Sequence, residues 1–433
     1  MRAGRGRAYA RRTFAAEGAD HVRNGQGHIF MTSADAMTSP ETVTAPAGAG
    51  QAPPTFTLSF LMIGNIIIGA GVLAPAAMIN SMSADLAVSV TGIGALIGWG
   101  AVILCAGAPL LGFASNRMGR RTLLSLSLLV YAAGHGLSAL ATDYASVLII
   151  RLIMISAAAV YTPQAAGTVA LIVPEIRRAG AVAYVFMGWS VAAAICVPLM
   201  SLAADASGWR AVYGVLALGA GISAACVAWL TPARLHAARM SLAMWGEVLT
   251  RPAIVLLLAT TAIQMAGQFI LYPYLAAELK ATRGADAGGV ALVLGLYGGA
   301  GLVGALASAR LVGRAGAPRM QLTSLIFIAL GLSLWSALSS AYVAAALACT
   351  LWGLGFGAVV SMQQARLIAV SPAHASASVA LNTSVLYLGQ AVGVGVGSTL
   401  VEANAGAWLG PAGLAFILLA LAASFTAWRR LGA

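Results

Sequence analysis

Charged side chains are scarce in this sequence: Asp, Glu, Lys and Arg make up only 8% of its 433 residues. Soluble domains carry about 25% charged residues, so this composition cannot cover a water-facing surface and excludes a soluble globular protein. A disordered chain is also excluded, because it needs low hydrophobicity and 60% of these residues are hydrophobic. A mean hydropathy of +0.89 over this length predicts an all-α polytopic membrane protein.

Lysine is almost missing, and acidic residues are few. Among 24 basic residues Lys280 is the single lysine, and 12 acidic residues leave a formal net charge of +12. The arginines lie in short clusters between apolar runs rather than on one face of a domain, which argues against nucleic acid as a partner. We attribute the excess of positive charge to arginine-rich loops on one side of a membrane.

The four cysteines form no Cys-x-x-Cys pair, and each lies inside an apolar run. This spacing predicts no metal site, no redox centre and no bound cofactor. Because the sequence offers no buried nucleophile–base or metal constellation, we do not expect an enzyme.

Twelve apolar runs follow Thr55, each long enough to cross about 30 Å of hydrocarbon. They predict transmembrane helices at 55–82, 90–113, 122–142, 146–172, 181–204, 211–230, 253–279, 289–313, 321–340, 342–370, 376–402 and 411–428. Residues 1–52 are rich in Arg and then in Thr, Ala, Pro and Gly, which predicts a disordered cytoplasmic tail. A second interpretation is a mis-assigned start, with translation beginning at Met31 or Met37.

The breaks between these runs fall into two sets that differ in charge. One set carries fourteen arginines, whereas the opposite set carries only Arg210, Lys280 and Arg283. The positive-inside rule places the arginine-rich set in the cytoplasm, so both termini are predicted to be cytoplasmic. The longest break, 231–252, predicts a cytoplasmic linker between six-helix bundles at 53–230 and 253–433, an arrangement typical of secondary transporters. We expect a monomer in the lipid bilayer of a bacterial inner (plasma) membrane.

The break after the second predicted helix carries a loop motif. Its residues are Gly112, Asn116, Arg117, Gly119, Arg120 and Arg121. The spacing resembles the major facilitator superfamily signature Gly-x-x-x-Asp-Arg-x-Gly-Arg-Arg, whose arginines are thought to clamp helix ends during the conformational switch. This sequence departs from it at Asn116, which supplies no charge. The alternative interpretation is an ordinary positively charged loop.

Arg151 lies about two turns inside the fourth predicted helix. A charge embedded in a membrane is costly and is a functional-site hypothesis by default. The superfamily often has Arg-x-x-Gln-Gly here, linked to proton coupling, but this chain lacks the Gln and the Gly. Coupling and an arginine that snorkels to the interface remain two open interpretations.

The fifth predicted helix contains Gly188 and Pro198, which resemble the helix-bend motif of drug exporters. Met200 and Ser201 stand where that family has further glycine, so ordinary use of Gly and Pro in a membrane helix is an equal alternative. Together with the amides and glycines of the seventh, tenth and eleventh helices, these motifs resemble the bicyclomycin-resistance and arabinose-efflux-permease-like branch of twelve-helix drug:proton antiporters.

That resemblance implies a central substrate cavity lined by polar and aromatic residues from both bundles. The matching positions are Asn65, Tyr161, Gln164, Trp189, Gln264, Gln268, Tyr272, Trp352, Asn382, Tyr387 and Gln390. Each could instead form a hydrogen bond between helices, because buried amides and hydroxyls need partners. As a set they predict a neutral, aromatic-lined pocket for a small molecule.

All acidic residues fall in the tail, in loops or at helix ends. A proton antiporter needs a group that exchanges its proton at depth, and Glu278 is the nearest candidate for coupling. His135 has a suitable ordinary pKa, but we interpret it as structural.

The sequence therefore predicts a secondary transporter that works by alternating access and exports a small amphiphilic compound, with proton antiport as the expectation from the resemblance. A uniporter or importer of a sugar or other neutral solute is the alternative, favoured by the missing intramembrane carboxylate. A non-transporting membrane sensor on the same fold is the third hypothesis.

Overall fold

The computed structural model describes residues 54–431, apart from 115–117, 233–234, 236–242 and 339–340. The predicted tail at 1–52 therefore lies outside the described residues. In the described part, twelve helices are long and apolar enough to cross a membrane, which confirms the predicted number.

The first six spans form an N-terminal bundle. Its elements are α1 (Pro54–Ala77), α2 (Ile79–Asp85), α3 (Val90–Ala114), α4 (Arg120–Leu140), α5 (Tyr144–Ile172), α6 (Glu175–Val191), the π-helical turn η1 (Ala192–Cys196), α7 (Val197–Ser207) and α8 (Trp209–Leu230). The first span, Thr55–Ala77, lies within α1 and ends before α2, whereas the fifth span, Ile176–Ser207, runs through α6, η1 and α7.

The last six spans form a C-terminal bundle, preceded by the short helix α9 (Ala243–Leu249). Its elements are α10 (Pro252–Leu271), η2 (Tyr272–Tyr274), α11 (Leu275–Arg283), α12 (Ala287–Ala315), α13 (Ala317–Ala337), α14 (Tyr342–Val370), η3 (Pro372–His374), α15 (Ala375–Glu402), η4 (Gly406–Trp408) and α16 (Leu409–Leu431). Part of the predicted linker at 231–252 is outside the described residues, so its limits stay a prediction.

Short-range signals account for where several helices begin. The Asp143 carboxylate accepts the Ser146 backbone N–H at 2.9 Å and caps α5, and Asp286 accepts the Gly289 N–H at 2.7 Å and caps α12. These contacts satisfy donors that a helix N-terminus leaves unpaired. Gly208, at φ +80°, supplies the sharp turn from α7 to α8.

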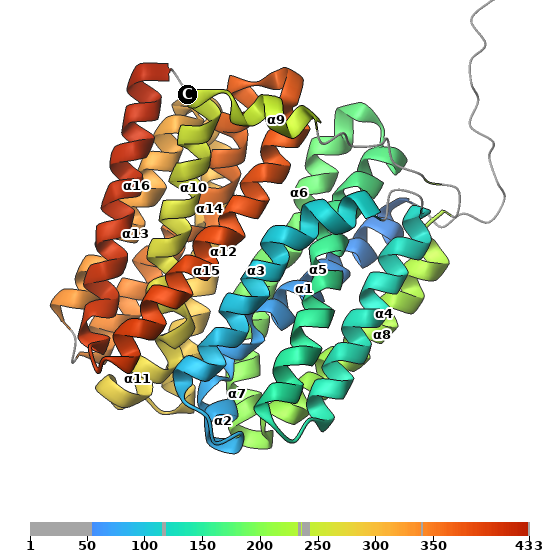
Figure 1. Ribbon diagram of the computed structural model, residues 1–433. Coiled ribbons are helices and arrows are strands. Elements are labelled where there is room, and N and C mark those ends of the chain that lie inside the picture. Colours follow the sequence, from blue (N-terminus) through green and yellow to red (C-terminus); the bar gives the residue numbers. More distant parts are fainter. Residues whose placement is uncertain (1–53, 115–117, 233–234, 236–242, 339–340, 432–433) are drawn as a thin grey trace, which may run out of the picture. The chain divides into compact units, whose positions relative to one another are not determined.

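The most extensive contacts between the bundles are made by α3, which packs along α15 (Figure 1), and by η1 and α7, which pack against α12. We call the end that carries Arg120, Arg251 and Arg430 the arginine-rich end, and the end that carries Asp85 and Asp205 the opposite end. Which end faces the cytoplasm stays a prediction.

The apolar core crosses the junction toward the opposite end. There Met78, Ile97 and Met200 share one buried cluster with Leu271 and Leu294 of the other bundle. Toward the arginine-rich end the buried clusters divide, with one within the N-terminal bundle and one formed by α9 and the C-terminal bundle. Among the described residues, the core between the bundles is thus continuous at one end of the molecule.

Candidate functional site at the bundle junction

Among the described residues of the N-terminal bundle, Arg151 is the charged residue with the least exposed surface. Its side chain is 1% exposed, and its guanidinium donates from Nε to the Leu96 carbonyl at 2.8 Å, from Nη1 to Gly71 at 3.2 Å and from Nη2 to Val72 at 2.9 Å. These acceptors belong to α3 and α1, so Arg151 joins three helices of one bundle. The contacts do not fit snorkelling to the interface, because a snorkelling side chain keeps its charged head in water.

A compact polar cluster lies beside this arginine: a β-carbon on Gly71, whose carbonyl accepts from Arg151, would meet the Tyr131 hydroxyl and the His135 ring. Tyr131, His135 and Tyr213 are each at most 1% exposed, and the His135 ring lies 4.6 Å from the Tyr131 ring and 5.1 Å from the Tyr213 ring, centre to centre. Tyr131 donates to the Ile68 carbonyl at 3.0 Å, so it also contacts α1. This cluster fixes α1 within the bundle.

In the C-terminal bundle, the predicted amides and aromatics contact one another. Gln268 Oε1 accepts the indole N–H of Trp352 at 3.0 Å, and Gln264 Oε1 accepts from the side chain of Gln321 at 2.8 Å. Tyr272 lies 6.2 Å from Trp352, ring centre to centre, in an edge-to-face arrangement that aromatic pairs favour. Gln321 was not among the predicted residues, although it begins a predicted span.

Other predicted cavity residues form hydrogen bonds between helices of their own bundle. Asn65 is fully buried, donates to the Val185 carbonyl and accepts from Thr162. The buried Tyr161 hydroxyl donates to the Leu61 carbonyl at 3.3 Å, and buried Asn382 accepts from Thr261 at 2.6 Å. Gln390 is 3% exposed. For most of the predicted cavity residues, the geometry therefore fits the alternative interpretation, in which they join helices rather than line a cavity.

Three predicted residues retain accessible surface: Gln164, Trp189 and Tyr387 are half-buried. Trp189 of α6 and Tyr387 of α15 pack on the same cluster of the N-terminal bundle, so Tyr387 reaches that cluster from the other bundle. These three uncharged side chains are the members of the predicted set that keep accessible surface, and Tyr387 lies where the two bundles meet.

The described inter-bundle hydrogen bonds lie at the opposite end. Asn80 of α2 donates to the Ala276 carbonyl of α11 at 3.2 Å, and Lys280 Nζ lies 2.9 Å from Asp205 Oδ1. The sequence analysis missed both contacts, although one signal was available: Lys280 is the single lysine. Together with the shared core, they close this end of the junction in the described arrangement.

The fifth span touches the other bundle through its π-helical turn. A β-carbon on Gly298 of α12 would lie 2.2 Å from the Ala193 carbonyl oxygen, so only glycine permits this approach. Pro198, which has no N–H, follows the turn. Gly188 permits a similar approach of α6 to α1, because a β-carbon there would lie 2.6 Å from the Met62 carbonyl. The predicted helix-bend residues thus flank a π-helical turn, a feature often found at functional sites.

The loop motif is described in part. Asn116 and Arg117 lie outside the described residues, Gly112 lies near the end of α3, and Gly119 is the N-cap of α4. Arg120 is 8% exposed, and its backbone N–H donates to the Leu235 carbonyl of the linker at 2.9 Å. Half-buried Arg121 follows it in the first turn of α4.

Glu278 lies apart from the junction residues. It is half-buried in α11 at the opposite end, and a β-carbon on Gly406 would lie 3.1 Å from its Oε1 atom. Its carboxylate therefore faces the turn between α15 and α16 rather than Arg151. Among the described residues, no group of three His, Cys, Asp or Glu side chains could hold a metal ion.

Two six-helix bundles that meet at one end, with uncharged side chains at the junction, define the class of secondary membrane transporters. Residues 60–394 match the Major Facilitator Superfamily, and the chain belongs to that family. This assignment confirms the predicted superfamily, whereas the efflux branch stays a prediction.

Relatives match along most of the chain. The chain is 27% identical over 376 residues to a protein named "Inner membrane transport protein YdhP" of Escherichia coli K12, covering 85% of this chain and 96% of that one. It is 24% identical over 369 residues to "Uncharacterized MFS-type transporter YbcL" of Bacillus subtilis, covering 84% and 95%.

Solved structures share the fold. A bacterial homologue of the human lysosomal transporter Spinster, described as inward-facing and unoccupied, has a TM-score of 0.68 at 15% identity, covering 87% of this chain and 98% of that chain. A D-xylose–proton symporter has a TM-score of 0.69 at 16% identity, with the same coverage. At these identities the likeness establishes the fold alone.

Proposed function

We propose that this transporter works by alternating access in a bacterial inner membrane and exports a small, uncharged or weakly charged amphiphilic compound. The observation that carries the proposal is the chemistry of the predicted residues that keep accessible surface: Gln164, Trp189 and Tyr387 are half-buried, uncharged and contributed by both bundles. An aromatic surface with a few polar groups suits an amphiphile, whose apolar body stacks while a polar group is oriented.

Proton antiport is the proposed energy source, with Glu278 as its candidate group. Support comes from the partly buried position of its carboxylate in the seventh span. Because Glu278 lies at the opposite end and not beside Gln164, Trp189 or Tyr387, coupling to a ligand at those residues would have to act through movement of α11.

Arg151 has a positioning role in this proposal rather than a proton-carrying one. Each nitrogen of its guanidinium donates to a backbone carbonyl, and arginine stays protonated in proteins. It holds α1 and α3 in place while the bundles move.

A uniporter or importer of a neutral solute is the second candidate. It is favoured by the positions of the acidic residues, which all fall outside the middle of the spans. Without an exchangeable group at depth, transport would follow the solute gradient alone.

The first experiment is a ligand screen on the purified full chain. A ligand that binds the native state raises the melting temperature by mass action, so the panel contains neutral antibiotics, lipophilic cations, sugars and amino acids. We expect a saturable shift with amphiphiles. A shift confined to sugars or amino acids would favour the importer, and no shift across the panel would contradict binding of the tested classes.

A matched pair of variants tests the site. Tyr387→Phe removes one hydroxyl at the junction, and we expect it to weaken the ligand by about 2–10-fold, the equivalent of a hydrogen bond of about 0.5–1.5 kcal/mol. Tyr342→Phe removes a hydroxyl that donates to the Gly289 carbonyl within the C-terminal bundle and should leave affinity unchanged. Equal affinities in both variants would contradict the role of Tyr387.

Flux in proteoliposomes tests coupling. We expect an imposed proton gradient to accelerate flux of the ligand, and Glu278→Gln to abolish that acceleration while leaving ligand-induced stabilisation intact. Equal flux with and without a gradient would reject antiport and support the uniporter. Acceleration that survives Glu278→Gln would reject Glu278 as the coupling group.

A further inference from the structure

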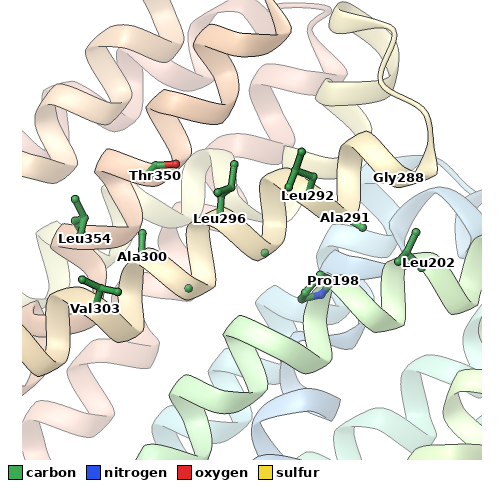
Figure 2. Close-up of a pocket in the computed structure, with 12 residues that line it drawn as sticks. Pro198, Leu202, Gly288, Ala291, Leu292, Leu296, Ala300, Val303, Thr350 and Leu354 are labelled. Atoms are coloured by element: carbon green, nitrogen blue, oxygen red, sulfur yellow. The ribbon is translucent and has the colours of Figure 1, made fainter.

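A lipid-facing groove of about 600 Å³ follows α12 at the junction of the bundles. Figure 2 shows Pro198 and Leu202 of α7 on one side of α12, and Thr350 and Leu354 of α14 on the other. Because α7 and α12 belong to different bundles, the groove depends on their relative position.

The groove follows from small residues on one face of α12. Gly288, Gly295 and Gly299 recur at intervals of seven and four, which places them on the same side of a helix. A β-carbon on Gly299 would meet nothing within 4 Å, whereas one on Gly295 would lie 3.7 Å from the Pro198 ring. The missing side chains therefore leave room that neighbouring helices do not fill.

The groove lies within the apolar spans that contain α7 and α12, and its rim residues Leu202, Leu292 and Val303 are 41%, 56% and 57% exposed. We infer from this position and exposure that the groove faces the hydrocarbon of the bilayer. From Gly288 to Val303 it extends about 22 Å at 1.5 Å per residue, longer than the roughly 15 Å of one leaflet of a 30 Å hydrocarbon core. An acyl chain of one leaflet fits along it.

Polar groups lie beside the groove at the opposite end. A pocket of about 20 Å³ there is lined by Asn80, Ser201, Asp205, Lys280 and Ala287, the last adjoining Gly288 of the groove. The side chains of Lys280 and Asp205 are 36% and 49% exposed, so both charges remain accessible although they pair with each other. An accessible cation beside an accessible anion complements a zwitterion.

We propose that the groove and the Lys280–Asp205 pair together bind one zwitterionic phospholipid of the phosphatidylethanolamine type. One acyl chain lies along α12, the phosphate faces Lys280 Nζ and the ammonium group faces Asp205. Because an acyl chain gains no hydrophobic free energy on leaving the bilayer, van der Waals packing and headgroup charge supply the selectivity.

This lipid contacts both bundles. Asp205 and α7 belong to the N-terminal bundle, and Lys280 and α12 belong to the C-terminal bundle. Binding therefore stabilises the arrangement in which the opposite end is closed, since a ligand shifts an equilibrium toward the state that it binds better. The site is independent of which compound is transported.

The test uses the full chain in nanodiscs that contain phosphatidylethanolamine with a photoreactive diazirine in one acyl chain. After irradiation, we expect labelled peptides from α7 and α12. Gly299→Leu places a side chain in the groove from a position where a β-carbon meets nothing within 4 Å, and we expect labelling there to fall about tenfold, equivalent to about 1.4 kcal/mol. Gly214→Leu on α8 is the matched control, because a β-carbon there also meets nothing within 4 Å.

A headgroup arm tests the charged pair. Lys280→Gln should reduce labelling by phosphatidylethanolamine several-fold, and a phosphatidylglycerol probe should label the groove more weakly than phosphatidylethanolamine in the parent chain. Equal labelling by both lipids in both proteins would overturn the headgroup assignment.

Three further outcomes would overturn the proposal. Labelling spread evenly over all lipid-facing helices would mean that the groove selects no lipid. Labelling of α12 that Gly299→Leu leaves unchanged would place the chain outside the groove. Displacement of the probe by compounds from the ligand screen, but not by unlabelled phosphatidylethanolamine, would assign the groove to transported molecules.

Discussion

The Arg151 guanidinium donates to the carbonyl oxygen of Gly71 at 3.2 Å. In an α-helix this oxygen would accept the N–H of residue 75, but Pro75 of α1 has none. Arg151 thus supplies the donor that proline removes, and its second nitrogen donates to the neighbouring Val72 carbonyl. The Arg151 side chain of α5 therefore stabilises α1 at the point where Pro75 removes a backbone hydrogen bond.

Arg151→Lys tests this contact while keeping the charge. One ammonium group cannot reproduce the fork that reaches α1 and α3 together, so we expect a loss of about 1.5–3 kcal/mol in stability, the range for hydrogen bonds to charged groups. The measurement is the melting temperature of the purified variant. Arg314→Lys, at an exposed position of α12, is the control. An unchanged melting temperature for Arg151→Lys would contradict the structural role.

Gly298→Ala tests the contact between the π-helical turn and α12. The added methyl group would lie 2.2 Å from the Ala193 carbonyl, so the backbones must separate. We expect a cost of about 1–3 kcal/mol, as for overpacked cores, and slower transport. Gly299→Ala, one residue along and facing open space, should behave as the parent chain. Equal stability of both variants would show that the bundles tolerate separation here.

Trp352→Phe removes the indole donor to Gln268 in the C-terminal bundle. Both residues are at most 1% exposed, so the amide oxygen is left without this donor, and we expect a cost of about 1–3 kcal/mol. The double variant Trp352→Phe/Gln268→Leu should lose less than the sum of the single changes, because it removes both partners. A double-mutant cycle measures this coupling, and strict additivity would contradict it.

Asp85 makes stability depend on pH at the opposite end. Hydrogen bonds from Arg210, and then from Trp209, hold the pKa of this carboxyl below its usual value. A lowered folded-state pKa contributes stability above the unfolded value, about 3.9, and this contribution is lost as pH falls through the folded-state pKa. The difference in melting temperature between the parent chain and Asp85→Asn should be largest near neutral pH.

That difference should narrow below about pH 4. Because Asp85 and Arg210 are 46% and 36% exposed, water screens the pair and the effect is small. A difference that stays constant from pH 7 to pH 3 would show that Asp85 acts through packing rather than through its charge.

Several features could be predicted from local sequence because they depend on the bilayer. The number of spans follows from apolar runs that must satisfy their backbone polar groups as helices, and the loop signature at Gly119 and Arg120 led to the superfamily. The sequence also identified the polar residues in the middle of the spans, but it could not predict which contacts they make. Asn65 and Gln268 form hydrogen bonds within their own bundles, whereas Tyr387 packs on the other bundle.

The sequence by itself determined that this protein is a twelve-span membrane transporter, because hydrophobic length and loop motifs are local properties. Only the tertiary structure decided which side chains meet: Arg151 with Gly71 from 80 positions away, and Lys280 with Asp205 from 75 positions away. In helices surrounded by lipid, a polar residue gives the same sequence signal whether it faces a neighbouring helix or a ligand. Helix rotation and packing, which depend on contacts distant in sequence, make that difference.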